Sequence, residues 1–146
     1  MSETFQHILT QLPYSEPFLF VDTLEKVTDE GVTGSYTFAT NADFYKGHFK
    51  DHPVTPGVIL TECMAQIGVV CLGIHLFRDQ PKPPQIALTH HEVDFFLPVY
   101  PGERVTVLSE KEYFRFQKLK CNVQMRNGQG QLVCKGSISG MIPKAT

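Results

Sequence analysis

The chain has 146 residues, of which 42% are hydrophobic, enough to bury one core and too few for two comfortable domains. Thirteen basic and fifteen acidic side chains leave a net charge of -2, so nothing in the charge balance argues for nucleic acid or an anionic membrane surface as partner. We therefore expect one domain spanning residues 1–146.

The N-terminus does not combine a basic start, an apolar run and a small-residue cleavage site, so it predicts no secretory signal. The chain contains four cysteines, Cys63, Cys71, Cys121 and Cys134. In a cytoplasmic protein we expect them to be buried free thiols. One alternative stays open: a two-residue turn at residues 127–128 would put Cys121 opposite Cys134, and a longer turn would shift that pairing.

The first third of the chain predicts a short helix and a hairpin. Apolar residues at helical spacing in residues 5–9 predict an amphipathic helix that stops before Pro13. Residues 17–29 and 31–40 flank a turn-like DEG sequence and predict two paired strands. Residues 40–55 are expected to form a loop.

Residues 56–77 are apolar on nearly every side and too long for one strand, so they predict a helix. Thr55 is the expected N-cap and Pro56 the first helical residue. A helix that is apolar all round must be surrounded by lipid or by protein. Because Glu62 and Gln66 lie inside the segment, we favour burial in a sheet over a membrane span.

The second half of the chain predicts mainly strands. The proline-rich residues 78–85 cannot continue the helix. Strands are expected in residues 86–96, 104–125 and 131–142, and the middle segment is long enough for one bent strand or two. This order predicts an α+β fold in which an antiparallel sheet wraps a central helix.

The stretch GHFKDHPVTPGVILTECMAQ, residues 47–66, carries the candidate chemistry. The positive end of the helix points at the loop that holds His48, and Gly57 lets a ligand approach the backbone there. Burying an ionised carboxylate without partners is costly, so packing alone does not explain Glu62. Gln66 lies one turn further along the same face and can hold that carboxylate by a hydrogen bond.

A carboxyl group that burial keeps protonated near neutral pH can donate a proton, and an imidazole can accept one. Glu62 and His48 are therefore a candidate general acid and base. A metal site is less favoured, because Pro53 follows His48 and His52 in a non-helical segment and the two rings would not share a face. Cys63 has no adjacent base in sequence and is expected to pack in the core.

The run from residue 47 to 66 closely resembles the active-site segment of the hot-dog-fold 3-hydroxyacyl-[acyl carrier protein] dehydratases of fatty acid synthesis, the FabZ type, whose pattern is GHFPxxPVxPGVLxxExxAQ. Further matches are LP followed by PFLFVD in residues 12–22 and PVYPGE at residues 98–103, in the order and spacing of that family. The resemblance implies the hot-dog fold, a curved antiparallel sheet wrapped around one long central helix.

The resemblance also implies a homodimer, or a higher oligomer built from it, with active sites shared between subunits. His48 of one subunit would face Glu62 of the other at the mouth of an apolar tunnel. His48 would remove the α-proton of a 3-hydroxyacyl thioester, and Glu62 would protonate the departing hydroxyl. Gly57 and Gln66 are the expected substrate-binding or oxyanion residues. Acyl carrier protein is the implied partner, and neither a metal nor an organic cofactor is required.

Some positions depart from the family pattern. Tyr14 and Ser15 stand where histidine and arginine are usual, and Glu92, Asp94 and Phe96 stand where basic residues are frequent. Carrier proteins are acidic, so the usual basic docking residues are missing from that segment. Candidate substitutes are Lys46, Lys50, Arg115, Lys118 and Lys120. These departures favour a specialised dehydratase, of a polyketide or polyene pathway or with a different carrier, over a housekeeping enzyme.

Two alternatives from other functional classes stay open. A hot-dog acyl thioesterase uses a carboxylate on the same helix to activate water but needs no paired loop histidine. A non-catalytic dehydratase-like subunit would serve only as partner to an active homologue. The presence of both His48 and Glu62 favours the dehydratase.

The tunnel floor is expected at the far end of the helix, around Cys71, Leu72 and His75.

Overall fold

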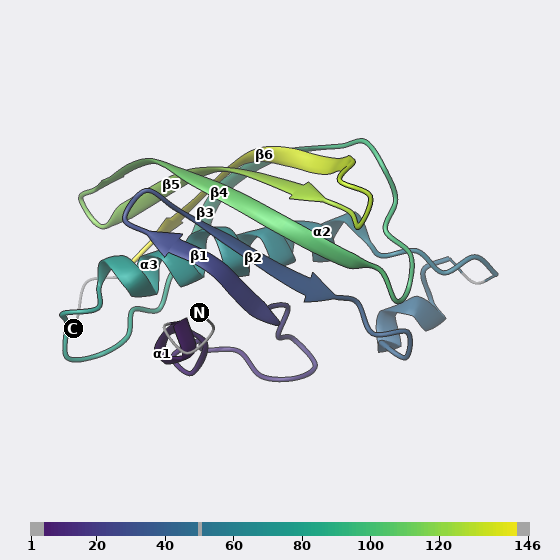
Figure 1. Ribbon diagram of the computed structural model, residues 1–146, viewed down its shortest axis with the longest axis horizontal. Coiled ribbons are helices and arrows are strands. Elements are labelled where there is room, and N and C mark those ends of the chain that lie inside the picture. The colour runs from purple at the N-terminus through teal and green to yellow at the C-terminus, as the bar shows by residue number, and fades with distance from the viewer. Residues whose placement is uncertain (1–4, 50, 143–146) are drawn as a thin grey trace.

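The computed structural model of the protein describes residues 5–49 and 51–142. A six-stranded antiparallel sheet curves around one helical rod (Figure 1). The strand order is β1-β2-β4-β5-β6-β3, so β1 and β3 form the two edges. The predicted α+β architecture, a hot-dog fold with one long helix inside a curved sheet, is confirmed.

The strands are β1 (Thr23–Thr28), β2 (Gly31–Thr37), β3 (Ala87–Phe95), β4 (Arg104–Arg115), β5 (Lys118–Arg126) and β6 (Leu132–Met141). The helical elements are α1 (Gln6–Leu9), the 3₁₀ turn η2 (Asp43–Lys46), α2 (Gly57–Ala65), the π-helical η3 (Gln66–Val70) and α3 (Cys71–Leu76). The predicted N-terminal helix, the first hairpin and the central helix are thus confirmed. The long segment after residue 103 forms two strands.

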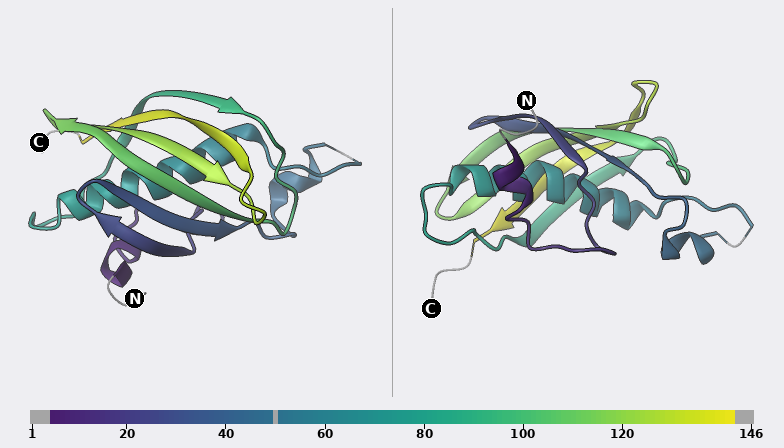
Figure 2. Two further views of the ribbon diagram at one scale, coloured as in Figure 1. Left: turned by 45° about the horizontal axis from the view of Figure 1, so that its top comes forward. Right: turned by 60° about the horizontal axis from the view of Figure 1, so that its bottom comes forward.

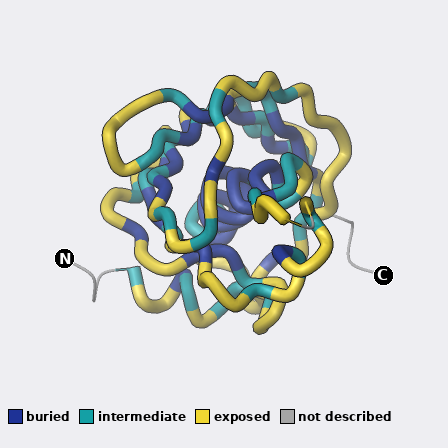
Figure 3. The backbone as a smooth tube through the Cα atoms, turned by 90° about the vertical axis from the view of Figure 1, so that its right-hand side faces the viewer, coloured by how far each residue is buried: buried dark blue, intermediate teal, exposed yellow. Residues whose placement is uncertain are grey.

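The central rod consists of α2, η3 and α3 in direct succession. Seen end-on in Figure 3, it lies as a buried core inside the ring of strands. Its composition and length would suit a membrane span, but 72% of its most apolar 18-residue stretch is buried inside the fold. Burial in the sheet, as the sequence predicts, therefore satisfies a helix that is apolar on all sides.

The helix begins one residue later than expected. Pro56 has an extended ψ of 139° and precedes the first turn, so Gly57 is the first helical residue. The hydroxyl of Thr55 does not cap the helix, because it lies 2.6 Å from the hydroxyl of Tyr45. This bond ties the entry of the helix to η2, the element just before the histidine loop.

The rod contains a π-helical turn in its middle. Within it the Ser109 hydroxyl, from β4, donates a hydrogen bond of 2.8 Å to the carbonyl oxygen of Gly68. A Cβ on Gly68 would lie 3.1 Å from both the Ser109 Cβ and a methyl of Val123. The close approach of helix and sheet at this point therefore depends on a glycine.

The segment between α1 and β1 crosses the side of the helix that the sheet leaves open (right panel of Figure 2). Residues 17–22 were expected to belong to the first strand, but β1 begins only at Thr23. The backbone of Phe18 and Phe20 bonds to the side chain of Gln66 on the helix. These residues therefore cover the helix instead of extending the sheet.

The loop between β5 and β6 is longer than two residues, with Asn127 paired to Gln131 at its base. The register consequently sets Cys134 opposite Met125 and Cys121 opposite Ile138. The alternative pairing of Cys121 with Cys134 is wrong, and all four cysteines are free and buried.

Candidate active site

Glu62 lies on α2 and lines a cavity of about 150 Å³. Apart from Glu62 and the phenol of Tyr14, the walls are mainly aliphatic and come from the helix, from β6 and from the start of β3. Ala65 and Val69 follow Glu62 along one face of the rod and form its helical wall. A single carboxylate therefore faces a cavity whose lining side chains are mostly aliphatic.

Gln66 holds this carboxylate in position. Its side-chain amide donates hydrogen bonds to Glu62 Oε2 at 2.9 Å and to the carbonyl oxygen of Phe18 at 3.1 Å. Its carbonyl oxygen accepts the N–H of Phe20 at 2.8 Å. The side chain is fully buried and all its polar atoms are used within the chain. Its placement favours a positioning role over direct contact with substrate.

Tyr14 shares the cavity with Glu62 and was not among the site residues expected from the sequence. Burial, and secondarily the negative charge of Glu62, raises the pKa of the Tyr14 phenol to about 12. The phenol is therefore protonated at physiological pH and can donate a hydrogen bond into the cavity. The departure from the family pattern at this position was the available sequence signal.

His48 lies in the loop between η2 and α2, half-buried against Phe49, whose ring stacks on the imidazole at 4.4 Å. The imidazole Nδ1 lies 3.0 Å from the carbonyl oxygen of Val54. A carbonyl oxygen only accepts, so Nδ1 carries the hydrogen and Nε2 of the neutral ring keeps its lone pair. The loop thus presents a positioned proton acceptor.

Gly57 lies at the amino end of the rod in a second cavity, of about 320 Å³, together with Phe95 and Phe96. The first amides that bond back to Pro56 belong to Ile59 and Leu60. Among residues 5–49 and 51–142, the amides of Gly57 and Val58 have no hydrogen-bond partner. Two N–H groups at a positive helix end therefore remain available for an anionic oxygen.

One chain does not bring all these residues together. His48 lines neither the cavity of Glu62 nor that of Gly57, and within the described part of the chain no hydrogen bond joins it to Glu62. Glu62 and Gln66 form one group, whereas Gly57 and His48 lie apart from it. Within the described part of the chain, the loop histidine and the helix carboxylate therefore belong to separate places of the fold.

Neither a thiol nucleophile nor a metal centre is supported in the described part of this region. Burial raises the pKa of the Cys63 thiol far above its usual range, and the thiol donates to the carbonyl oxygen of Phe20 at 3.4 Å. Cys63 therefore packs in the core. Within residues 5–49 and 51–142, no three side chains of His, Cys, Asp or Glu are grouped as metal ligands.

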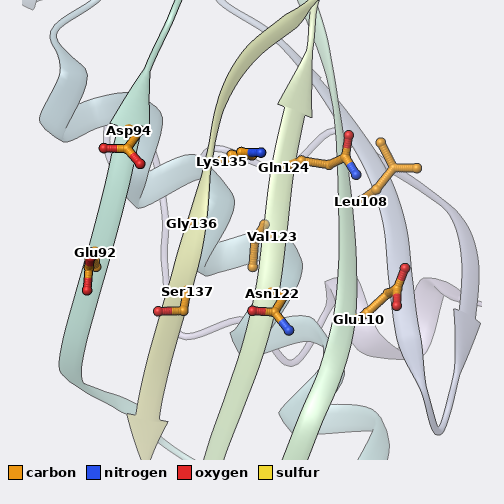
Figure 4. Close-up of a pocket in the computed structure, with 10 residues that line it drawn as sticks. All are labelled: Glu92, Asp94, Leu108, Glu110, Asn122, Val123, Gln124, Lys135, Gly136 and Ser137. Atoms are coloured by element: carbon orange, nitrogen blue, oxygen red, sulfur yellow. The ribbon is translucent and has the colours of Figure 1, made fainter.

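A larger hollow, of about 500 Å³, lies elsewhere, on the outer face of the sheet (Figure 4). Side chains of β3, β4, β5 and β6 line it, with Glu92, Asp94 and Glu110 outnumbering Lys135. It contains neither the helix carboxylate nor the loop histidine. We therefore assign the chemistry to the smaller cavity on the inner side of the sheet.

The candidate basic docking residues do not form one patch. Lys46 lies in η2 and is paired with Asp43 at 3.3 Å, while Lys50 lies outside the described residues. Arg115 and Lys118 flank the β4–β5 turn, at the opposite end of the molecule (Figure 1), and Lys120 next to them is paired with Glu112 at 3.0 Å.

Residues 12–138 match the family model of the FabA-like domain. A 3-hydroxyacyl-[acyl-carrier-protein] dehydratase FabZ from Acinetobacter baumannii is 31% identical over 139 residues, which are 94% of this chain and 87% of that protein. The protein of the same name from Chlamydia trachomatis serovar L2 is 32% identical over 141 residues, covering 95% of this chain and 92% of that one.

Solved structures share the fold at lower identity. The dehydratase heterocomplex ApeI:P from Xenorhabdus doucetiae aligns with a TM-score of 0.78 at 15% identity, covering 94% of this chain and 91% of that one. A hypothetical thioesterase with coenzyme A from Streptococcus pneumoniae aligns with a TM-score of 0.65 at 14% identity, covering 98% and 97%. At such identities the likeness concerns the fold alone.

Proposed function

The chain belongs to the FabA-like domain family, and on that premise we propose that it is a 3-hydroxyacyl-[acyl carrier protein] dehydratase of fatty acid or related biosynthesis. Its substrate is a (3R)-3-hydroxyacyl thioester carried by acyl carrier protein, and its product is the trans-2-enoyl thioester. The observation that carries the proposal is the carboxylate of Glu62, which Gln66 holds in place beside a cavity with mainly aliphatic walls. Such walls suit an acyl chain. We assign it to the cytoplasm.

The reaction divides between two side chains. His48 Nε2 takes the proton from C2 of the substrate, and the electron pair left there forms the double bond to C3. Glu62, in its protonated form, gives a proton to the C3 hydroxyl, which leaves as water. The free amides at Gly57 and Val58 stabilise the negative charge that develops on the thioester oxygen. The thioester itself makes the C2 proton acidic.

The catalytic pair is shared between two copies of the chain in this proposal. The support is that, within the described residues of one chain, His48 does not line the cavity of Glu62. The edge strand β3 supports it too, because all its residues except Val93 are exposed and it carries half-exposed Leu88 and Phe95. A second copy placed along that edge would cover these side chains.

The proposal is tested by following enoyl absorbance with a short enoyl thioester in the hydration direction. We expect His48→Ala and Glu62→Gln each to lower kcat by at least about 100-fold, because each removes one proton-transfer group. His52→Ala, in the same loop, and Glu110→Gln, on the outer face, are matched controls that should keep wild-type rates. Wild-type rates in both catalytic-residue variants would contradict the assignment.

The same assay separates the dehydratase from a thioesterase. Thioester cleavage releases a free thiol, whereas dehydration and hydration leave the thioester intact. Thiol release at the rate of substrate loss, without change in enoyl absorbance, would favour the thioesterase instead.

Mixing the two inactive variants tests whether the sites are shared. A mixed dimer of His48→Ala and Glu62→Gln subunits has one site with both changes and one site with neither. After unfolding and refolding together, we expect about a quarter of the wild-type activity, since half of the dimers are mixed. No recovery, with dimers present, would place both groups of each site in one chain.

A further inference from the structure

Ile86, the residue just before β3, lines the cavity of Glu62. The Ile86 side chain lies between the helix and β6 and rests on two glycines. A Cβ on Gly73, in α3, would overlap its Cδ1 atom, and a Cβ on Gly140, in β6, would overlap its Cγ2 atom. Ile86 therefore fills the space that side chains at these two positions would otherwise occupy.

The helix shows how the cavity runs. Glu62, Ala65, Val69 and Gly73 follow one another at intervals of three or four residues, so they lie on one face of the rod. Ala65 and Val69 line the cavity together with Glu62, and Ile86 covers Gly73 on the next turn of this face.

We propose that Ile86 is the floor of the acyl cavity and makes the enzyme selective for short acyl chains, an inference that rests on the proposed function. The volume of about 150 Å³ holds roughly five water-sized atoms at about 30 Å³ each. Beyond the hydroxyl-bearing carbon there is room for a chain of roughly that length, which corresponds to 3-hydroxyoctanoyl.

The residues expected to form the floor from the sequence are engaged elsewhere. Cys71 and Leu72 are fully buried in the core and do not line the cavity. His75 bonds to Asp29 at 2.9 Å, on the β1–β2 turn. The floor therefore comes from outside the helix, at the point where the proline-rich connector joins β3.

The test is kcat/KM for a series of 3-hydroxyacyl thioesters from butanoyl to dodecanoyl, on the same carrier. For the wild-type protein we expect similar values up to octanoyl and a fall of at least about tenfold at decanoyl, because two further methylenes find no space. Equal values from butanoyl to dodecanoyl would overturn the proposal.

Ile86→Ala removes three carbon atoms from the floor. We expect the ratio of decanoyl to hexanoyl kcat/KM to rise at least about tenfold, since two more methylenes can then be buried. The matched control is Leu76→Ala, which removes as many carbon atoms from α3 but does not line the cavity, and should leave that ratio unchanged. An unchanged ratio in Ile86→Ala would overturn the proposal.

Gly73→Ala tests the contact itself. The methyl group of the new alanine should push Ile86 into the cavity and lower the ratio of decanoyl to hexanoyl kcat/KM. This effect should vanish in the Gly73→Ala, Ile86→Ala double variant. An equal effect in both backgrounds would show that Ile86 is not the affected neighbour and would overturn the contact.

Two measurements keep these outcomes separate from other failures. Ile86→Val, a smaller change, should raise the ratio by a lesser factor, and circular dichroism melting reports whether each variant is folded. Wild-type turnover of the butanoyl substrate decides the proposed function, because that chain is too short to reach the floor. If the butanoyl thioester is turned over but the ratio of decanoyl to hexanoyl kcat/KM does not change in the Ile86 variants, only the assignment of Ile86 as the floor is overturned.

Discussion

Gln66 connects the chemistry of the site to the packing of the chain. One buried amide satisfies the backbone of Phe18 and Phe20 and at the same time orients Glu62. A carboxylate held from one side keeps its other oxygen directed at substrate, which is how positioning contributes to rate. The sequence predicts this pair because residues four apart share a helix face.

Changing Gln66 to Ala should therefore affect rate and stability together. We expect kcat to fall about tenfold or more with KM within about twofold, because Glu62 loses its orientation. The free energy of unfolding should fall by about 1–3 kcal/mol, because a buried backbone N–H and C=O lose their partner. Steady-state kinetics and urea unfolding measure the two effects.

Gln124→Ala, on the outer face of the sheet, is the control for loss of a glutamine. Retention of full kcat in Gln66→Ala would show that Glu62 is held by something other than this amide.

Among the elements, the β4–β5 hairpin is the one that the sequence leaves undecided. Its two turn residues, Phe116 and Gln117, have φ values of 52° and 64°, the left-handed region that glycine and asparagine favour. Neither residue type is typical of such a turn, so from the sequence alone the segment could be one bent strand or two. Phe116 is 89% exposed, and burial does not offset the strain at this turn.

The turn should accept a better sequence. We expect the Phe116→Asn, Gln117→Gly double variant to raise the free energy of unfolding by about 1 kcal/mol, because both residues then suit positive φ. Urea unfolding at one fixed protein concentration measures it. Gln124→Gly, inside β5, is the opposite control and should destabilise by about 0.5–1 kcal/mol. Equal destabilisation by both changes would contradict the strain argument.

What the sequence predicts well is set by local periodicity. The apolar run of the central rod and the alternation in the strands are local signals, and both lead to the right elements. Residues 17–22 are rich in strand-forming apolar residues, yet Phe18 and Phe20 bond to Gln66 across the fold, a tertiary contact that no local pattern contains. The role of Ile86 likewise depends on two glycines distant in sequence.

At the scale of the whole molecule, β3 is the unfinished part of the sheet. It pairs with β6 on one side, and its exposed residues occupy both faces, whereas β5 and much of β4 alternate between buried and exposed. An open edge of this length invites another strand. The pairing of His48 with Glu62 across two copies comes from the family resemblance and stays a prediction, because residue spacing within one chain does not contain a contact between two chains.

Hydrogen exchange can test this edge. We expect the outward-facing amides of β3 to be protected at micromolar concentration and to lose protection on dilution, as a covering second copy dissociates. The amides that bond to β6 should stay protected throughout and serve as the internal control. Sedimentation at the same concentrations gives the oligomeric state, and fast exchange of the outer amides in an intact dimer would show that the copies meet elsewhere.

The docking of Phe18 and Phe20 on Gln66 has a consequence for proteolysis. A cut in the segment ahead of β1 leaves every strand of the sheet in place, yet it frees the peptide that clamps the glutamine. Such a cleaved protein would remain folded, but the carboxylate of Glu62 would lose its fixed orientation. The turnover rate therefore reports whether the segment ahead of β1 is uncut.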